Sequence, residues 1–242
     1  MEELRVTGTK RNAAARSDID PEYDDILTML EKSDTAEVYD REHLGELKKQ
    51  MEAFAAKHHV DIINVKGRRV LQEVVAEVKP HRVLELGTAI GFSSMLIAEN
   101  ASSDVEITTM ELIEKRVLTA NYFISHSPFK GRIKVIPGSA GDSLNNLSAE
   151  EKFDFVYIDA AKAQYPDYFR KVYSHLTENA VVVADNVLFR GLTEQESGVP
   201  RRMRTIAKRL REYIDMVSNN PEFSTEIRHD GDGLAISKRI LK

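Results

Sequence analysis

The chain has 242 residues, of which 42% are hydrophobic and 30% are charged, so it can bury a sizeable core and is predicted to form one globular domain. It contains no cysteine, which excludes disulfides and thiolate metal sites and leaves oxygen or imidazole groups as metal ligands. The formal net charge of -5 argues against nucleic-acid binding by the whole surface, although a local basic patch is compatible with it.

The first third of the chain is predicted to be helical after a polar tail. Residues 1–20 are small, polar and charged, and we expect them to form a flexible tail. They lack the apolar stretch of a signal peptide, and no run in the chain approaches the roughly 20 apolar residues of a membrane span. We therefore expect a cytoplasmic protein that does not enter a membrane. Apolar residues at helical spacing predict helices over 21–32, 40–59 and 67–78.

The pattern changes after Pro80, where short apolar runs alternate with segments long enough for a crossover helix. The runs that we expect to be strands are 82–87, 105–111, 132–137, 153–160 and 180–186. Such alternation predicts an α/β fold with a parallel sheet covered by helices on both faces. Two strand-like runs within 223–239 flank the letters DGDG and predict an antiparallel hairpin at one sheet edge. The predicted domain is 21–242, with N-terminal helices in 21–79 and the α/β core in 80–242.

Ligands of such sheets collect at the carboxyl ends of the strands, and the first strand end reads VLELGTAIGFSS. Gly87 and Gly91 flank a tight strand-to-helix turn in which a ligand can approach the backbone. Their spacing is not that of a dinucleotide-binding loop, and a turn without any ligand is the alternative. Glu85 favours a ligand, because an acid within an apolar strand can pair with a cationic group.

The second strand ends in TTMELIEK and places Glu111 at the position where nucleoside-binding sheets hold an acid against ribose hydroxyls, about 20 residues past the glycine loop. A solvated acid in the first turn of a helix, favoured by the helix dipole, is the alternative. Glu85 and Glu111 together suit a ligand that combines a cation with a ribose.

The fourth strand ends in FVYIDAAKAQY, with Asp159 at the end of a buried run and Lys162 three residues later. The fifth ends in Asp185 and Asn186. Each residue has a simpler interpretation, as a turn, a helix cap or a surface lysine. Two carboxylates at adjacent buried strand ends repel each other, however, unless a cation lies between them. These oxygen donors suit Mg²⁺, and Mn²⁺ or Ca²⁺ would also be accepted, while Lys162 could reach the same cleft as a base.

The motifs VLELGTAIGFSS, TTMELIEK, VIPGSAGD, VYIDAAKAQY and VVVADNVLFRG, in this order and spacing, resemble the metal-dependent O-methyltransferases of the class I S-adenosylmethionine fold. This is the group of catechol and caffeoyl-CoA methyltransferases, and the resemblance covers residues 58–240. It implies a Rossmann-like fold with a mostly parallel seven-stranded sheet, a C-terminal antiparallel hairpin and N-terminal helices. It also implies S-adenosyl-L-methionine as the methyl donor and a homodimer.

The resemblance assigns roles to individual residues. The residues around the cofactor would be Val60, Ile62, Glu85, Gly87, Ser93, Glu111, Ala140 and Asp159. The metal ligands would be Asp159, Asp185 and Asn186. Glu111 would hold the ribose, Ala140 would lie at the adenine, and Lys162 would be the catalytic base. Ala160 and Ala161 depart from the bulkier, aromatic wall of animal catechol enzymes, which argues against catechol itself as the substrate.

Within the family, the letters IDAAKAQY, ADNVLFRG and GDGLAISK are most similar to the bacterial tRNA 5-hydroxyuridine methyltransferases, which act at the wobble position of the anticodon. The O4 and 5-hydroxyl oxygens of that base form a chelating pair like that of a catechol. Basic residues that would bind the RNA backbone are Arg190, Arg201, Arg202 and Arg204. A solvated helix face is the alternative for this basic cluster.

Two other functions stay open. A small catechol-like or phenolic compound could be the acceptor at the same site. A binding protein that keeps the nucleoside pocket without turnover is the other, and the complete set of Asp159, Lys162, Asp185 and Asn186 argues against it.

Overall fold

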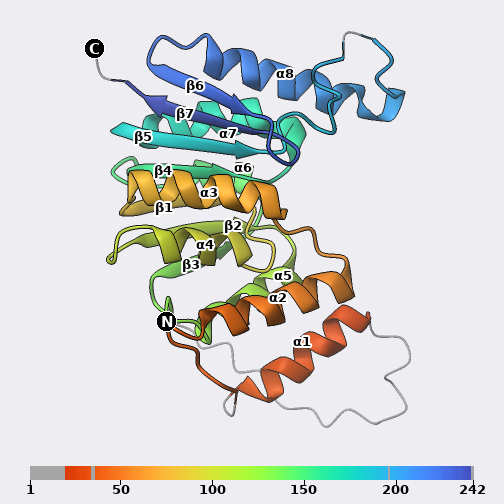
Figure 1. Ribbon diagram of the computed structural model, residues 1–242, viewed down its shortest axis with the longest axis vertical. Coiled ribbons are helices and arrows are strands. Elements are labelled where there is room, and N and C mark those ends of the chain that lie inside the picture. Colours follow the sequence, from red (N-terminus) through yellow and green to blue (C-terminus); the bar gives the residue numbers. More distant parts are fainter. Residues whose placement is uncertain (1–19, 34–35, 196, 241–242) are drawn as a thin grey trace.

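The computed structural model describes residues 20–33, 36–195 and 197–240, which form a seven-stranded sheet between helices (Figure 1). The strands are β1 (Arg82–Leu86), β2 (Glu106–Glu111), β3 (Ile133–Pro137), β4 (Phe153–Ile158), β5 (Leu176–Asp185), β6 (Phe223–Arg228) and β7 (Leu234–Arg239). Their order is β3-β2-β1-β4-β5-β7-β6. The first five strands pair in parallel, whereas β7 is antiparallel to both of its neighbours. The predicted sheet and its C-terminal hairpin are confirmed.

The helices are α1 (Pro21–Glu31), α2 (Leu44–His58), α3 (Val65–Val78), α4 (Phe92–Asn100), α5 (Glu114–Ser125), α6 (Ala140–Asn145), α7 (Tyr165–Val172) and α8 (Arg204–Ser218). Short 3₁₀ turns are η3 (Lys162–Gln164), η4 (Tyr173–His175) and η5 (Arg201–Met203). Asp20 caps α1 by accepting a hydrogen bond from the Glu22 amide, and Pro21 occupies the first turn. Asn64 caps α3 in the same way, so this helix begins before the predicted residue 67.

The core lies in two layers, one on each face of the sheet. Alternate strand residues point to opposite faces, so that Val83 and Phe155 belong to one layer while Leu84 and Val156 belong to the other. Helices α2, α3, α4 and α5 contribute to the first layer, and α6, α7 and α8 to the second. In Figure 1, α3 accordingly lies in front of the sheet and α7 behind it. The central strands are therefore apolar on both faces, as parallel strands require.

The N-terminal helix α1 is tied to α5. Its Ile26 is buried, and the ammonium of Lys115 on α5 pairs with Asp20 at 2.8 Å and with Glu22. The predicted tail lies outside the described residues except for Asp20. Within the described part of the chain, none of the helices is long and apolar enough to cross a membrane.

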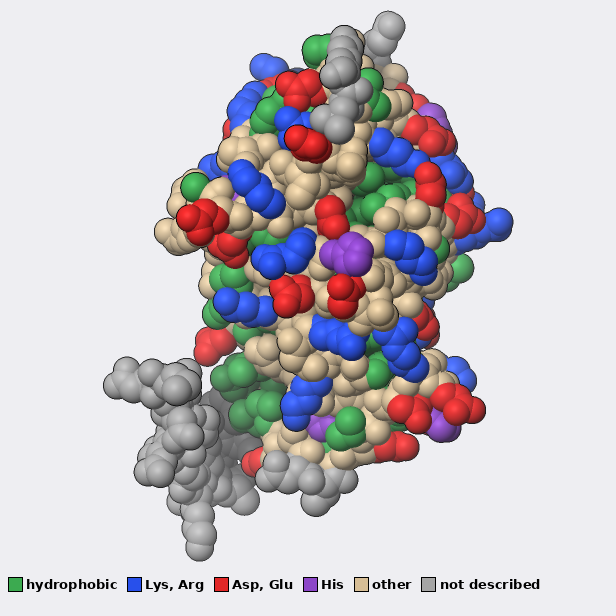
Figure 2. Space-filling view, turned by 90° about the vertical axis from the view of Figure 1, so that its left-hand side faces the viewer, with side chains coloured by type: hydrophobic (Ala, Val, Ile, Leu, Met, Phe, Trp, Pro, Cys, Tyr) green, Lys and Arg blue, Asp and Glu red, His purple; other side chains and the backbone are tan. Residues whose placement is uncertain are grey.

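The edge where the parallel strands begin carries charges of both signs (Figure 2). Lysine and arginine side chains alternate there with carboxylates, and His81–Asp104 and Arg82–Glu106 form ion pairs at 2.8 and 3.2 Å. Such a mixed surface creates no strong field of one sign. A basic surface for a polyanion must therefore be sought elsewhere.

The opposite ends of β1 and β4 approach each other closely at Gly87. This residue has a positive φ of 99°, and a Cβ atom there would lie 2.0 Å from the carbonyl oxygen of Asp159. The Asp159 amide also donates a hydrogen bond to the Leu86 carbonyl at 2.9 Å. Glycine at position 87 thus allows the backbone that carries Asp159 to lie against the end of β1.

We predict that Gly87→Ala destabilises the protein by about 1–3 kcal/mol more than Gly131→Ala does, as measured by urea unfolding. Both glycines have positive φ, so both variants carry the backbone strain of alanine in that region, about 1–2 kcal/mol. No atom lies within 4 Å of a Cβ at Gly131, so only Gly87→Ala adds a clash. Equal losses in the two variants would show that the Asp159 carbonyl moves away without cost.

Candidate active site

A cavity of about 340 Å³ lies at the carboxyl ends of β1, β2 and β4. The strand order reverses between β1 and β4, and ligands of open α/β sheets bind at such a switch point. The predicted residues that line the cavity are Ile62, Gly87, Ser93, Glu111, Ala140, Asp159 and Lys162. Residues as far apart in sequence as Ile62 and Lys162 therefore meet in one wall.

Other predicted residues lie outside the cavity wall. Val60 is buried and lines a shallower pocket, which shares Asp61 and Ile62 with the cavity. Glu85 and Asp185 are buried behind the wall, and Asn186 follows Asp185. The four predicted RNA-binding arginines are exposed and do not line the cavity.

Glu111 connects the ends of β1 and β2 while facing the cavity. Its Oε2 accepts a hydrogen bond from the Ala89 amide at 2.8 Å, and its Oε1 accepts one from the Ile113 amide at 2.8 Å. These bonds hold the carboxylate in one orientation, and each oxygen has a lone pair left for a further donor. A ribose hydroxyl is such a donor, so the geometry is compatible with the predicted role.

Glu85 is fully buried beneath the cavity. Its Oε2 accepts hydrogen bonds from the hydroxyls of Ser94 and Thr109, the latter at 2.6 Å, whereas its Oε1 has no partner within the described residues. Burial raises the pKa of this carboxyl to about 7, although the hydroxyls of Ser93, Ser94 and Thr109 act in the opposite direction. Ser93 lines the cavity, so the acid is one side chain away from a ligand bound there.

Asp159 and Lys162 face each other at the start of the turn that follows β4. The Lys162 ammonium lies 3.5 Å from Asp159 Oδ1, and both side chains are about one quarter exposed. Burial raises the pKa of Asp159, and the charge of Asp61 across the cavity acts in the same direction, while Lys162 opposes both. The pair therefore forms a polar patch on the cavity wall, with an ammonium that a ligand can reach.

Asp185 is buried at the end of β5, next to β4. Its Oδ2 accepts a hydrogen bond from the Tyr157 hydroxyl at 3.0 Å, and its Oδ1 accepts one from the Asn186 amide at 2.7 Å. Burial raises the pKa of Asp185 to about 7, and the negative charge of Asp159 contributes to the rise. The charge of Asp159 thus disfavours the charged form of Asp185, as expected for acids that share one site.

The loop after β5 is held in an unusual conformation by the hairpin. Asn186, Phe189 and Arg190 all have positive φ, which is uncommon for residues other than glycine. The amides of Val187 and Leu188 donate hydrogen bonds to the carbonyls of Gly233 and Asp232, each at 3.0 Å. The Arg190 amide also donates to the Asp232 carboxylate. The DGDG turn therefore fixes the loop that carries Asn186, a conformation of the kind that clusters at functional sites.

The chemistry of Asp159, Asp185 and Asn186 fits a hard divalent cation. No group of three or more histidine, cysteine, aspartate or glutamate residues suited to a metal occurs in the part of the chain that the structure describes. The predicted trio, however, consists of two carboxylates and one amide. Two acids whose pKa values are raised by burial and by a nearby carboxylate favour a cation beside them, and their oxygens are ligands that Mg²⁺ accepts.

The basic residues divide into structural and available ones. Arg204 donates to the Val199 carbonyl at 3.1 Å. Arg211 donates to the carbonyls of Leu192, Thr193 and Gln195, and so fastens the loop before α8. Cations whose side chains form no ion pair or hydrogen bond with the described residues include Arg190, Arg201, Arg202 and Lys208, all exposed. Phosphate groups could reach these without breaking an internal contact.

Among the described cavity residues that were not predicted from the sequence, Arg116 is the one with an unpartnered buried donor. Arg116, in the first turn of α5, lines the cavity, and its Nε is buried without a partner among the described atoms. An unpartnered buried donor is costly unless a ligand accepts from it. An arginine in the first turn of an amphipathic helix reads as a surface residue, so no sequence signal marked it.

Comparisons with known proteins point to one family. The model of a family described as O-methyltransferase matches residues 2–240. A caffeoyl-CoA O-methyltransferase from Stellaria longipes is 24% identical over 212 residues, which cover 82% of this chain and 84% of that protein. A catechol O-methyltransferase from Mycobacterium tuberculosis is 33% identical over 111 residues, or 46% of this chain and 50% of that protein.

The fold is likewise similar to known structures. A crystal structure of an O-methyltransferase from Bacillus cereus in complex with SAH has a TM-score of 0.72 and 23% sequence identity. The similarity covers 88% of this chain and 97% of the Bacillus cereus chain. At 23% identity this similarity supports the fold alone.

We predict that Glu85→Gln weakens the pH dependence of stability. Glu85 keeps its proton up to about pH 7 in the folded chain, but only up to its ordinary pKa of 4.5 after unfolding. Its contribution to stability is therefore fully present below pH 4.5 and is lost as the pH rises to about 7, a total of about 3 kcal/mol.

The measurement is urea unfolding of both proteins at about pH 5 and about pH 8. Asp159 and Asp185 titrate in both proteins, so the difference between the two isolates Glu85. An unchanged pH dependence in Glu85→Gln would mean that the carboxyl is hydrated in the folded chain.

Proposed function

The chain belongs to the O-methyltransferase family, whose members transfer a methyl group from S-adenosylmethionine to an oxygen atom, and we propose that its acceptor is the 5-hydroxyl of 5-hydroxyuridine in tRNA. We further propose that the reaction depends on a divalent cation and yields 5-methoxyuridine. The residues at the strand ends support the divalent cation, and the distribution of basic side chains supports the tRNA acceptor.

The cavity wall offers a suitable partner for each part of the methyl donor. Glu111, fixed by two backbone amides, can accept hydrogen bonds from the ribose hydroxyls. Gly87 lets the donor lie against the backbone, and Ser93 connects it with the buried Glu85. Ala140 leaves space for the adenine ring. Arg116 provides a donor for a nitrogen or oxygen atom of the adenosine.

Asp159, Asp185 and Asn186 would hold the divalent cation. A cation bound by them supplies Lewis-acid polarisation of the acceptor hydroxyl and an attachment for two vicinal oxygens. The 5-hydroxyl and O4 of hydroxyuridine are such a pair. The Tyr157 hydroxyl, which donates to Asp185, keeps this carboxylate in place.

Lys162 would act as the base. Its Nζ lies on the cavity wall beside Asp159, where the neutral amine, formed when the ammonium releases a proton to solvent, would take the proton of the acceptor hydroxyl as the oxygen attacks the methyl carbon. The Asp159 carboxylate, 3.5 Å away, orients the amine. In the same step the bond between the methyl group and the donor sulfur would break, which leaves the sulfur neutral. The transfer would be direct, without a covalent enzyme intermediate.

The observation that carries the tRNA assignment is the set of exposed cations next to the site. Arg190 lies four residues after Asn186, Arg201 and Arg202 lie in η5 directly before α8, and Lys208 lies in α8. Their side chains make no contact with the described residues that phosphates would have to displace. A small uncharged phenol needs no such set, whereas an RNA backbone does.

A small catechol or phenol is the second candidate acceptor. The names of the relatives from Stellaria longipes and Mycobacterium tuberculosis favour it. A catechol would present the same pair of vicinal oxygens to the same ligands. The two candidates therefore require the same contacts inside the cavity and differ in the contacts that they make outside it.

We predict that Lys162→Met lowers kcat by about 100-fold or more, because the acceptor hydroxyl loses its base. The affinity for S-adenosylhomocysteine, measured by calorimetry, should stay within about twofold. Lys152→Met serves as the control, since Lys152 is exposed and bonds only the Ser174 carbonyl. A Lys162→Met enzyme with full turnover would remove the lysine from the reaction.

For the acceptor, we predict that purified protein with labelled S-adenosylmethionine and Mg²⁺ methylates hydroxyuridine-containing tRNA and that nucleoside mass analysis finds 5-methoxyuridine. A chelator should stop the reaction, and added Mg²⁺ should restore it. Transfer to caffeate or catechol, with none to tRNA, would refute the tRNA assignment while leaving the methyltransferase site intact.

The matched variant for this test is Arg201→Gln combined with Arg202→Gln. Because phosphate contacts dominate RNA affinity, the double variant should raise KM for tRNA by about tenfold and weaken its salt dependence. Turnover of a small phenolic acceptor, if measurable, should not change. An unaltered KM for tRNA would mean that the RNA contacts another surface.

A further inference from the structure

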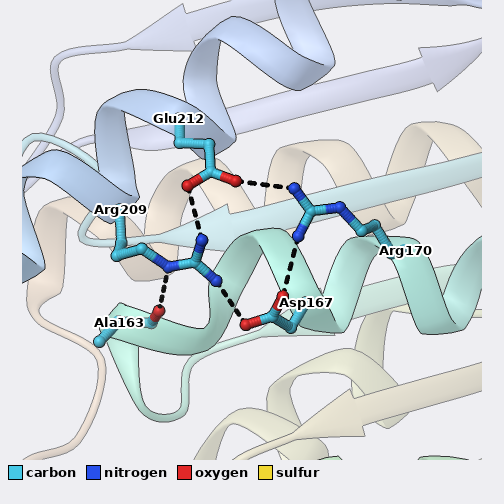
Figure 3. A network of polar contacts seen from close by, with 5 residues as sticks. All are labelled: Ala163, Asp167, Arg170, Arg209 and Glu212. Carbon is cyan, nitrogen blue, oxygen red and sulfur yellow. Dashed lines mark hydrogen bonds and ion pairs between the residues drawn. The ribbon is translucent and has the colours of Figure 1, made fainter.

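Four charged side chains form a closed ring between α7 and α8 (Figure 3). The ring consists of Asp167 and Arg170 on α7, with Arg209 and Glu212 on α8. Arg170 bonds Asp167 at 2.8 Å and Glu212 at 2.7 Å. Arg209 bonds Glu212 at 2.6 Å and also bonds Asp167. Each carboxylate thus bridges two guanidinium groups, and signs alternate around the ring.

Arg209 makes one contact that Arg170 does not make. Its Nε donates a hydrogen bond to the carbonyl oxygen of Ala163 at 2.9 Å, as Figure 3 shows. Ala163 is the middle residue of the 3₁₀ turn η3, which begins with Lys162. Arg209 therefore connects the long helix α8 to the residue next to the proposed base.

Few other hydrogen bonds among the described residues hold the turn η3 where it faces α8. It has no side-chain cap, and its own backbone bonds run from the Gln164 amide to the Ala161 carbonyl at 2.8 Å and from the Tyr165 amide to the Lys162 carbonyl. A 3₁₀ turn of this length is weakly held by its own hydrogen bonds. Its orientation consequently depends on contacts from neighbouring elements, among which the Arg209 bond engages the backbone directly.

We propose that Arg209 is a positioning residue for Lys162, and that Asp167 and Glu212, which both accept hydrogen bonds from it, hold its guanidinium in the conformation this requires. The proposal rests on the function proposed above for Lys162. All three guanidinium nitrogens are used, one for the turn and two for the carboxylates. A lysine at this position has no planar fork and cannot make all three bonds at once.

The physical reason for a catalytic effect is geometric. A long side chain magnifies any rotation of the backbone that carries it, so a small change in η3 displaces the Lys162 amine by more. A displacement of about 1 Å in a catalytic group can cost about 100-fold in rate. The ring contacts by themselves would only stabilise the packing of α7 against α8. Arg170 belongs to the ring but does not bond Ala163, so its variants separate this stabilising effect from the positioning of η3.

The first test compares Arg209→Lys with Arg170→Lys. Both variants keep the charge and disturb two ring contacts, but only the first loses the bond to η3. We expect Arg209→Lys to lower kcat by about 10- to 100-fold, with KM for S-adenosylmethionine and affinity for S-adenosylhomocysteine within twofold. Arg170→Lys should keep kcat within about twofold. Equal losses in the two variants would overturn the proposal.

The second test asks whether Arg209 acts through Lys162. In a Lys162→Met background, Arg209→Lys should cause no further loss of kcat, because the group that it positions is absent. Losses that add fully would overturn the proposal and leave the proposed function standing. Full activity of Lys162→Met alone would instead overturn the base assignment and, with it, the positioning role.

A third readout needs no acceptor and also checks folding. Hydrogen exchange at the Gln164 and Tyr165 amides, which donate to the Ala161 and Lys162 carbonyls, should be faster in Arg209→Lys and unchanged in Arg170→Lys, while the strands β4 and β5 stay protected in both. Unchanged exchange at the turn in Arg209→Lys would show that other contacts hold η3, and the positioning role would be refuted even if no acceptor had been found.

Discussion

Burial of three carboxyl groups at the ends of neighbouring strands is the constraint on which the site depends. Glu85, Asp159 and Asp185 lie at the ends of β1, β4 and β5, and burial raises the pKa of each. The fold offsets this cost in part, through the Tyr157 hydroxyl at Asp185 and the ammonium of Lys162 at Asp159. Two of the acids remain without a full counter-charge. A cationic cofactor and a divalent cation would reduce the remaining free-energy cost of burying these carboxyl groups. Their burial therefore lowers the stability of the unliganded protein and favours binding of cations.

The backbone around these acids is held from several directions. The Tyr165 hydroxyl contacts the carbonyls of Ile158 and Asp185 at 3.2 and 3.0 Å, and so links the ends of β4 and β5. The C-terminal hairpin performs a similar task on the next loop, because a Cβ at Gly233 would lie 2.2 Å from Leu188. The antiparallel edge of the sheet therefore has a role beyond completing the core. It fixes the loop that presents Asn186.

The sequence alone predicted the strand ends well and the surroundings of each side chain poorly. Apolar runs that stop at an acid or a glycine mark the ends of β1, β2, β4 and β5, because buried parallel strands must be apolar and polar groups appear where they end. Whether an acid lies in the cavity wall or behind it depends on packing, and Glu85 could not be separated from Glu111 on this point. Arg116 gave no signal, since its role follows from the direction of one helix turn. Similarly, no motif indicated that Arg211 would hold the loop before α8 through the Thr193 carbonyl.

Helix α8 and the turn before it are involved in both proposals, the binding of the acceptor and the positioning of Lys162. The 3₁₀ turn η5, directly before the helix, exposes Arg201 and Arg202, and α8 itself exposes Lys208, where a phosphate backbone could reach them, while Arg209 bonds the turn of Lys162. Adjacent positions on a helix point in directions about 100° apart, so neighbours such as Lys208 and Arg209 can serve different surfaces. An acceptor that binds these exposed cations would therefore contact the same segment whose Arg209 positions the proposed base. Recognition of a large substrate and placement of the catalytic amine would then depend on one rigid element, whereas a small acceptor would engage the cavity alone.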